Sequence, residues 1–322
     1  GYAAGARVAY GRSRPVTALE SDDNGDPISL FVGRPGTLGW LGSLPEETVF
    51  SVGAALGDGR FVVMGGVGGD GRLGNAREEI FTLDLTKPNS DLSWEISDEE
   101  MPRYWLPDED SDEDEGRRER AGATLSSITT GDDTGKFLLA GGCEGEPFEG
   151  ARTATADVQI YDPEEDQFDA IGKTDVLTSA RCGHAAIARS DGTILVWGGW
   201  GWTGSSNSIF AVVEGDLYDP AEREFNKVDV EQSRNSGTYG VALADLGEDG
   251  TMVSGGVLIG DFIADAGEYA DWKTTNTSFR VSLRGEVGSE SYAGLGAVAA
   301  HAMVAIGDGD VLSFGGVISN AA

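Results

Sequence analysis

The sequence contains two histidines, and both occupy the same position of a repeated pattern. His184 precedes the Gly198-Gly199 pair by 14 residues, and His301 precedes Gly315-Gly316 by the same 14. Histidine commonly serves as a general base near neutral pH or as a zinc ligand. A residue kept in register with a repeat is most simply structural, so we expect both rings to be bonded to neighbouring backbone. No histidine is then left for a Ser-His-Asp triad, an ordinary zinc site or a general base.

Carboxylates are the most abundant reactive groups, with 55 Asp and Glu residues against 23 Lys and Arg. Paired carboxylates can hydrolyse glycosidic bonds, which keeps a carbohydrate-active enzyme among the hypotheses. They can also bind Ca²⁺, although Glu115 stands where an EF-hand needs glycine, and no bidentate glutamate follows. We expect no cofactor, with looser Ca²⁺ binding as an alternative at Asp22, Asp26, Asp110, Asp112 and Asp114.

The elements that must position these residues come from a repeat. Gly141-Gly142 precedes Gly198-Gly199 by 57 residues, and Tyr161-Asp162-Pro163 precedes Tyr218-Asp219-Pro220 by the same 57. Each glycine pair follows an apolar run, and an Asp-Gly turn before such a run predicts a β-hairpin. Four strands per unit at this period predict an all-β propeller. The double glycine also occurs at Gly65-Gly66, Gly255-Gly256 and Gly315-Gly316.

The chain resembles the Kelch-repeat family at these residues. The resemblance rests on the Arg181-x-Gly183-His184 opening, the Asp-Gly turn, the apolar strand closed by two glycines, and the later Tyr-Asp-Pro followed by an aromatic residue. It implies a β-propeller of four-stranded antiparallel blades and covers about 270 of the 322 residues. Copper oxidases of this superfamily need His and Tyr ligands, which this chain lacks once both histidines are structural. The resemblance therefore implies a fold with many possible functions.

Six blades are the favoured number, with five or seven as alternatives. In the second blade Leu83-Asp84-Leu85 stands for Tyr-Asp-Pro, with Trp94 as the closing aromatic. In the fourth, a strand is expected from Phe210 to Tyr218, and in the fifth Tyr269-Ala270-Asp271 replaces the turn motif. Residues 101–116 are an acidic insertion expected to form an exposed loop. The blades are expected at 7–45, 46–100, 117–177, 178–232, 233–285 and 295–322, with residues 6–11 closing the last one.

Propeller geometry also makes the two cysteines neighbours. Cys143 follows the double glycine of one blade, and Cys182 opens the first strand of the next. The end of a second strand and the start of a first strand share one face of a propeller, so we expect a Cys143–Cys182 disulfide. The alternative is two separate buried thiols. A disulfide would imply an oxidising compartment.

The net charge of −32 limits the partners. Such a field repels nucleic acid and anionic lipid head groups, so we expect neither. No run of 18 apolar residues is present, so we expect no membrane insertion. We expect a secreted, periplasmic or cell-surface protein, whose acidic surface keeps it soluble or attracts cations or a basic partner. The chain begins Gly-Tyr-Ala-Ala and ends Ser-Asn-Ala-Ala, which suggests that both ends are processed or incomplete.

Binding is expected on the face formed by the loops between strands 2 and 3 and between strands 4 and 1. These loops differ from blade to blade, whereas the opposite turns are short and repetitive, and variable loops on a rigid scaffold commonly carry binding sites. Trp200 and Trp202 have an alternative role as lids folded back on their blade. The candidate binding residues are Arg72, Arg77, Tyr104, Trp105, Phe148, Arg152, Trp200, Trp202 and Phe262.

The sequence favours a non-enzymatic propeller that presents this face to a protein or a polysaccharide. One alternative is a structural subunit of an extracellular surface assembly, joined through its open ends to other subunits by β-augmentation. The other is the carbohydrate-active enzyme that uses paired carboxylates.

Overall fold

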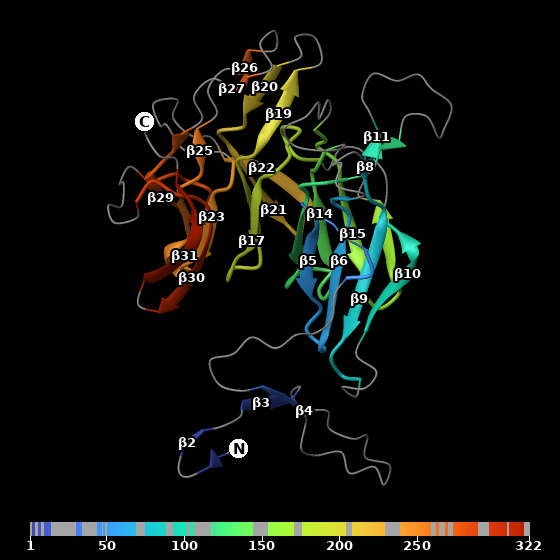
Figure 1. Ribbon diagram of the computed structural model, residues 1–322. Coiled ribbons are helices and arrows are strands. Elements are labelled where there is room, and N and C mark those ends of the chain that lie inside the picture. Colours follow the sequence, from blue (N-terminus) through green and yellow to red (C-terminus); the bar gives the residue numbers. More distant parts are fainter. Residues whose placement is uncertain are drawn as a thin grey trace.

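A computed structural model of the chain describes an all-β protein (Figure 1). No α-helix occurs in the described part, which contains one short 3₁₀ helix, η2 (Gly247–Asp249). No helix there is long and apolar enough to cross a membrane. The described residues are 2–3, 6–7, 10–13, 30–33, 44–46, 48, 50–68, 75–87, 93–101, 104–105, 117–118, 120–143, 154–170, 176–203, 208–228, 239–258, 262–263, 268–269, 273–288, 296–307 and 309–318.

Five antiparallel sheets follow one another along the chain. The first sheet contains β5 (Val52–Ala55), β6 (Arg60–Met64), β9 (Glu79–Asp84) and β10 (Trp94–Glu100). The second contains β13 (Thr124–Ser127), β14 (Phe137–Ala140), β15 (Val158–Asp162) and β16 (Gln167–Ala170). The third contains β17 (Ala185–Ala188), β18 (Ile194–Trp197), β21 (Gly215–Asp219) and β22 (Glu224–Val228). The fourth contains β23 (Ala242–Asp245), β24 (Thr251–Ser254) and β29 (Ser278–Val281), and the fifth β30 (Ala299–Gly307) and β31 (Asp310–Val317).

The core lies between successive sheets. All four residues of β14 are buried, as are all four of β18, because these second strands have a neighbouring sheet on each face. One cluster joins the first and second sheets around Met64 and Leu139, and another joins the second and third around Ile160 and Val196. A third cluster joins the third and fourth sheets, where the Trp197 and Phe279 ring centroids lie 5.2 Å apart.

The double glycines are where one sheet contacts the next. Both glycines of each pair have positive φ, for example 60° at Gly141 and 110° at Gly142. The Gly142 N–H donates to the Arg181 carbonyl of the next sheet at 2.9 Å. A Cβ on Gly141 would stand 2.7 Å from that same oxygen. Only glycine fits such a close approach at this φ. Gly66 donates in the same way to the Arg120 carbonyl, and Gly256 to that of Val298.

A second set of contacts joins the first strands, which lie side by side in the order β5, β13, β17, β23, β30. Gly122 N–H donates to the Phe50 carbonyl at 2.9 Å, Gly183 to Gly122 at 2.8 Å, and Ala300 to Gly240 at 2.7 Å. All five residues have φ between 51° and 65°. Phe50 and Ala300 therefore adopt, without being glycine, the conformation that glycine takes in the three middle sheets.

The turn motifs predicted from the sequence are confirmed in the first three sheets. Tyr161 pairs with Phe168 across the strands, and Tyr218 with Phe225, with ring centroids 5.0 and 4.8 Å apart. Leu83 and Trp94 occupy the matching positions in the first sheet. The aspartates of these turns, Asp84, Asp162 and Asp219, each accept a hydrogen bond from the N–H two residues later.

The strand assignment expected for residues 233–285, which form the fourth sheet of the structure, is wrong. Its third strand is β29, because Val281 pairs with Thr251 as Tyr218 pairs with Ile194 in the third sheet. The turn position is therefore Val281-Ser282-Leu283, not Tyr269-Ala270-Asp271. A rudimentary fourth strand follows, in which Val287 bridges to Val281.

Short ribbons extend from the ends of the sheets at which the double glycines lie. Figure 1 shows several of them together at the top of the view, and we call this end the loop end. Here β20 pairs with β19 and is separate from β21, so the single strand expected from Phe210 to Tyr218 is wrong. The ribbons pair β7 (Val67–Gly68) with β8 (Asn75–Ala76), β11 (Tyr104–Trp105) with β12 (Arg117–Arg118), β19 (Trp200–Thr203) with β20 (Ser208–Ala211), β25 (Val257–Leu258) with β28 (Lys273–Thr274), and β26 (Phe262–Ile263) with β27 (Glu268–Tyr269).

The opposite end, which we call the turn end, links neighbouring sheets through side chains. Arg60 donates to the Pro163 carbonyl of the second sheet at 3.1 Å. Arg223 of the third sheet donates to Asp133 of the second at 2.8 Å, and Arg189 donates to the Ser282 carbonyl of the fourth at 3.0 Å. These side chains are therefore used in packing the sheets together.

The N-terminal residues form two further ribbons. β1 (Tyr2–Ala3) pairs with β2 (Ala6–Arg7), and β3 (Tyr10–Ser13) pairs with β4 (Leu30–Gly33). In the described part of the chain neither ribbon is hydrogen-bonded into one of the five sheets. Figure 1 shows β3 and β4 below the turn end.

Candidate binding surface

The loop end contains every described candidate binding residue. Tyr104 and Trp105 form β11, Trp200 and Trp202 belong to β19, and Phe262 begins β26. The structure therefore places these elements at one end of the protein, and β20 lies beside β26. Arg72, Phe148 and Arg152 lie outside the described residues, as do the Ca²⁺ candidates Asp22, Asp26, Asp110, Asp112 and Asp114 and the acidic run.

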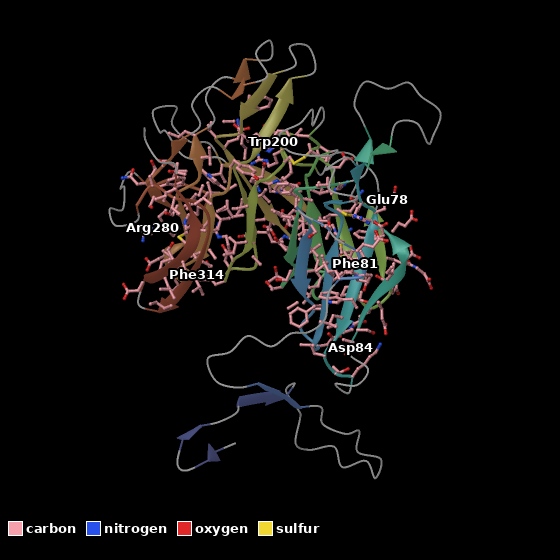
Figure 2. All side chains as sticks on the ribbon, in the orientation of Figure 1. Glu78, Phe81, Asp84, Trp200, Arg280 and Phe314 are labelled. Atoms are coloured by element: carbon pink, nitrogen blue, oxygen red, sulfur yellow. A yellow bond between two sulfur atoms is a disulfide. The ribbon has the colours of Figure 1, made fainter. Side chains whose placement is uncertain are left out.

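Trp200 is buried, with 1% of its surface exposed. Its ring packs with Cys143 and Cys182, and Tyr239 lies against the same cluster. Figure 2 shows Trp200 inside the body of the sheets at the base of the β19–β20 ribbon. This position fits the lid alternative, since a buried ring offers no surface to a ligand.

The predicted Cys143–Cys182 disulfide is present, with the two Cα atoms 5.5 Å apart. It joins the second sheet, just after Gly142, to the opening of the third. Cys182 also bridges to Trp200 through backbone hydrogen bonds of 2.9 and 3.0 Å. The disulfide therefore anchors the base of the β19–β20 ribbon to two sheets at once.

Phe210 is an exposed aromatic residue of the same ribbon that sequence reasoning missed. It lies opposite Gly201 in the strand pair, and 40% of its surface is exposed. A Cβ on Gly201 would stand 2.4 Å from Phe210 Cζ, so the ring lies directly on the glycine. The signal in the sequence was the glycine between Trp200 and Trp202, because an aromatic ring often covers a glycine across a strand pair. One face of the Phe210 ring thus packs against Gly201.

Two charged groups in the described part of the loop end, Arg77 and Glu214, have ionic partners. The Arg77 guanidinium forms ion pairs with Glu46 and, at 3.7 Å, with Glu79. Glu214 accepts a hydrogen bond from Ser179 Oγ at 2.5 Å and pairs with Lys227 Nζ at 2.9 Å. Burial raises the pKa of Glu214, but these bonds and the charges of Lys227 and Arg181 hold the pKa below its usual range.

Beneath this surface lies a fully buried ion pair. Arg181 Nη2 donates to Asp216 Oδ2 at 2.5 Å, and neither side chain is exposed. Asp216 also accepts hydrogen bonds from the backbone and hydroxyl of Thr178. Burial lowers the pKa of Arg181, and the carboxylates of Asp216 and Glu214 oppose that shift. The Arg181–Asp216 ion pair therefore holds in place Arg181, which directly precedes the disulfide residue Cys182.

Both histidines are buried in equivalent places. The Nε2 of His184 hydrogen-bonds the Thr124 hydroxyl of the second sheet at 2.8 Å, and the backbone of Ala140 is a further hydrogen-bond partner of the ring. Burial, and next the charge of Arg181, lower the pKa of His184 to about 3. His301 is also buried, which lowers its pKa. Neither ring is exposed enough to serve as a base for a bound substrate.

No group of three or more His, Cys, Asp or Glu side chains that could hold a metal ion occurs among the described residues. The candidate binding surface is therefore the surface of the loop-end ribbons. It includes the exposed side chains of Phe210, whose ring packs on Gly201, and of Val213. Such apolar groups among paired charges are suited to noncovalent binding.

No protein-family model matches the chain, and no curated protein matches it. A solved structure described as "Structure of YjhT" is similar to it in fold. The similarity covers 85% of this chain and 75% of that one, with a TM-score of 0.53 and 16% sequence identity. The chain therefore shares the fold of that protein across most of its length.

Proposed function

We propose that the chain is a Kelch-type β-propeller that binds a protein or a polysaccharide on its loop end without catalysing a reaction. The sheets are its blades, for which the sequence repeat favours six and leaves five or seven as alternatives. The recurring glycine contacts between successive sheets support this architecture, because they repeat one geometry from blade to blade.

The observation that carries the proposal is the difference between the two ends of the sheets. At the turn end, Asp84, Asp162 and Asp219 cap turns, and Arg60, Arg189 and Arg223 hold neighbouring sheets together. At the loop end, ribbons extend from the sheets and carry an aromatic ring with an exposed face. A rigid scaffold with one variable end is a common form of binding protein.

Charge and the disulfide narrow the partner and the compartment. A net charge of −32 disfavours anionic ligands, so the ligand is a neutral polysaccharide or a protein with a basic surface. The Cys143–Cys182 disulfide supports a secreted, periplasmic or cell-surface location, where thiols are oxidised.

Binding to a panel of neutral and charged polysaccharides and basic proteins tests the proposal. Phe210→Ala and Trp202→Ala should each weaken the binding of any ligand found by about fivefold or more, since a hot-spot aromatic at an interface contributes over about 1 kcal/mol. Ile96→Ala is the matched control, because Ile96 is an exposed apolar residue of β10 that is not part of a loop-end ribbon. Equal binding by all variants would contradict the assignment of this surface.

The same panel separates binding from catalysis. A binding protein leaves every polysaccharide intact, as measured by the release of reducing ends. Release that one Asp→Asn or Glu→Gln substitution abolishes would instead establish an enzyme with paired carboxylates.

A further inference from the structure

One asparagine of the fourth sheet belongs to a motif for covalent modification. Asn276-Thr277-Ser278 matches the acceptor sequence Asn-x-Ser/Thr of N-linked glycosylation, in which x is any residue except proline. Asn276 is the only asparagine in the sequence that is followed two residues later by serine or threonine. The motif is short, so its meaning depends on where the fold places its residues.

Asn276 lies in the connection between β28 and β29, at the loop end where β25 leaves the fourth sheet (Figure 1). The residues on both sides of it are bound to the double glycine. Thr275 N–H donates to the Gly256 carbonyl at 2.9 Å, and Gly255 N–H donates to the Thr277 carbonyl at 3.0 Å. The Thr277 N–H also donates to Thr275 Oγ1 at 3.1 Å. These bonds fix the backbone and leave the Asn276 side chain exposed.

The third sheet shows that exposure at this position follows from the fold. There the Val212 N–H donates to the second glycine of the pair, as the Thr275 N–H does in the fourth sheet. Val213 therefore occupies the position of Asn276, and it is 44% exposed. Within the described residues the Asn276 side chain forms no hydrogen bond, so its amide nitrogen is available for a new bond. A group attached there would project from the loop end into solvent.

The last residue of the motif is in the opposite situation. Ser278 is 3% exposed, and its hydroxyl lies 2.7 Å from that of Ser254, its partner in the β24–β29 ladder. The motif accepts serine or threonine, which share a hydroxyl group, so this hydroxyl is what a glycosyltransferase must recognise. The folded fourth sheet hides it. Recognition therefore requires a chain in which β24 and β29 have not yet paired.

We propose that Asn276 carries an N-linked oligosaccharide, which is transferred to the chain before the fourth sheet forms. The donor is an oligosaccharide joined through phosphate to a polyprenyl lipid. A bond forms between Asn276 Nδ2 and the anomeric carbon of the first sugar, and the bond from that carbon to the phosphate oxygen breaks. The lipid phosphate leaves with the electron pair, and the amide nitrogen loses one proton. The inference goes beyond the proposed function and rests on the proposed location outside the cytoplasm.

Mass spectrometry of the full chain purified from its native source tests the modification. Tryptic cleavage after Lys273 and Arg280 isolates the motif in the peptide 274–280. We expect this peptide at a mass increased by whole sugar residues, with sugar fragment ions in its spectrum. Recovery of the peptide at its unmodified mass alone would overturn the proposal.

Two variants made in the native source separate enzymatic transfer from a chemical adduct. Ser278→Ala removes the hydroxyl that the transferase recognises, so we expect the sugar to be lost. Ser254→Ala is the matched control, because it breaks the same Ser254–Ser278 hydrogen bond but leaves the motif intact, and it should keep the sugar. Sugar on Ser278→Ala, or its loss from both variants, would contradict recognition of the motif.

The order of events is tested with unmodified full-length protein from a host that lacks the transferase. The protein is added to membranes of the native source, which supply the transferase and the lipid-linked donor, either folded or freshly diluted from urea. We expect about tenfold or more transfer to the diluted chain, since Ser278 in the folded chain must first be freed by local unfolding. Equal transfer to the two forms, or transfer to neither, would refute the proposal. Ligand binding by wild type and Phe210→Ala is measured independently, so failure of either proposal leaves the other standing.

Discussion

Arg181 and Asp216 form an ion pair at 2.5 Å with no exposed surface on either side chain. In the second sheet the corresponding arginine, Arg120, is also buried, but its carboxylate Asp157 lies 4.0 Å away. Gln159 stands there at the position of Asp216, because it pairs with Leu139 as Asp216 pairs with Val196. The third sheet has therefore placed a full negative charge where its neighbour has an amide.

Removing that negative charge should be costly. Asp216→Asn leaves the Arg181 charge buried without its partner, and we expect a loss of about 3–5 kcal/mol in the free energy of unfolding. Urea denaturation measures the loss. Asp249→Asn breaks the exposed Arg280–Asp249 pair, where about 0–1 kcal/mol is expected. Equal effects of the two substitutions would show that the buried pair contributes nothing special.

Gly141 should not tolerate a side chain. Gly141→Ala puts a Cβ 2.7 Å from both the Arg181 carbonyl oxygen and His184 Cε1, at a φ of +60°. We expect at least about 2 kcal/mol of destabilisation, the sum of backbone strain and displaced packing. Gly135→Ala measures the backbone strain alone. Gly135 has a φ of +93°, but a Cβ there would meet nothing within 4 Å. If both variants lose the same stability by thermal unfolding, the sheet contact is not the cause.

The disulfide should stabilise the protein measurably. Cys143 and Cys182 are 39 residues apart, and a loop of that length corresponds to about 4 kcal/mol in the chain-entropy model. The double variant Cys143→Ser and Cys182→Ser should lose roughly 2–4 kcal/mol. Thiol titration of the denatured, unreduced wild-type protein should find no reactive thiol, and two reactive thiols per chain would contradict the disulfide.

Stability should fall in mild acid because of His184. Its folded pKa of about 3 lies below the ordinary value of about 6.5, so the unfolded chain takes up a proton first as the pH falls. The contribution is complete above about pH 6.5 and is lost progressively toward pH 3, by at most about 1.4 kcal/mol per pH unit. His184→Gln should flatten the dependence of unfolding free energy on pH between 6.5 and 5.

The same substitution at His301 provides a comparison. Burial lowers the pKa of His301 as well, so His301→Gln should change the pH dependence in the same direction. A pH profile of His184→Gln that matches the wild-type profile would mean that the ring is accessible to protons in the folded protein.

Local patterns predicted much of the fold. Several features could be predicted because each depends on a few residues at fixed spacing. They are the Asp-Gly turns, the double glycines, the Tyr161–Phe168 and Tyr218–Phe225 pairs and the disulfide. The fourth sheet was misassigned because Tyr269 and Asp271 imitate the turn motif, whereas the true position at Val281 lacks it. That position is recognisable only through its pairing with Thr251, a contact across 30 residues.

The loop end was harder to predict for a similar reason. Trp200 is of a residue type that is common in binding surfaces, but it is buried against the Cys143–Cys182 disulfide. Cys143 of that disulfide belongs to the preceding sheet. Phe210 was predicted to begin a single strand that runs to Tyr218, but it lies in a ribbon with Trp200 and Trp202. Exposure in such ribbons depends on contacts between sheets, and these cannot be inferred from the spacing within one repeat.

The hydrogen bonds between Phe50, Gly122 and Gly183, and between Gly240 and Ala300, involve backbone atoms alone. Phe50 and Ala300, at the two ends of the series, take this positive φ with a side chain. A Cβ on Gly122 would instead stand 2.8 Å from Cys182 Sγ, and one on Gly183 2.5 Å from the Tyr239 ring. The middle units therefore need glycine at this junction, so a duplicated middle unit would bring the required residue with it, whereas an end unit moved to the middle would not.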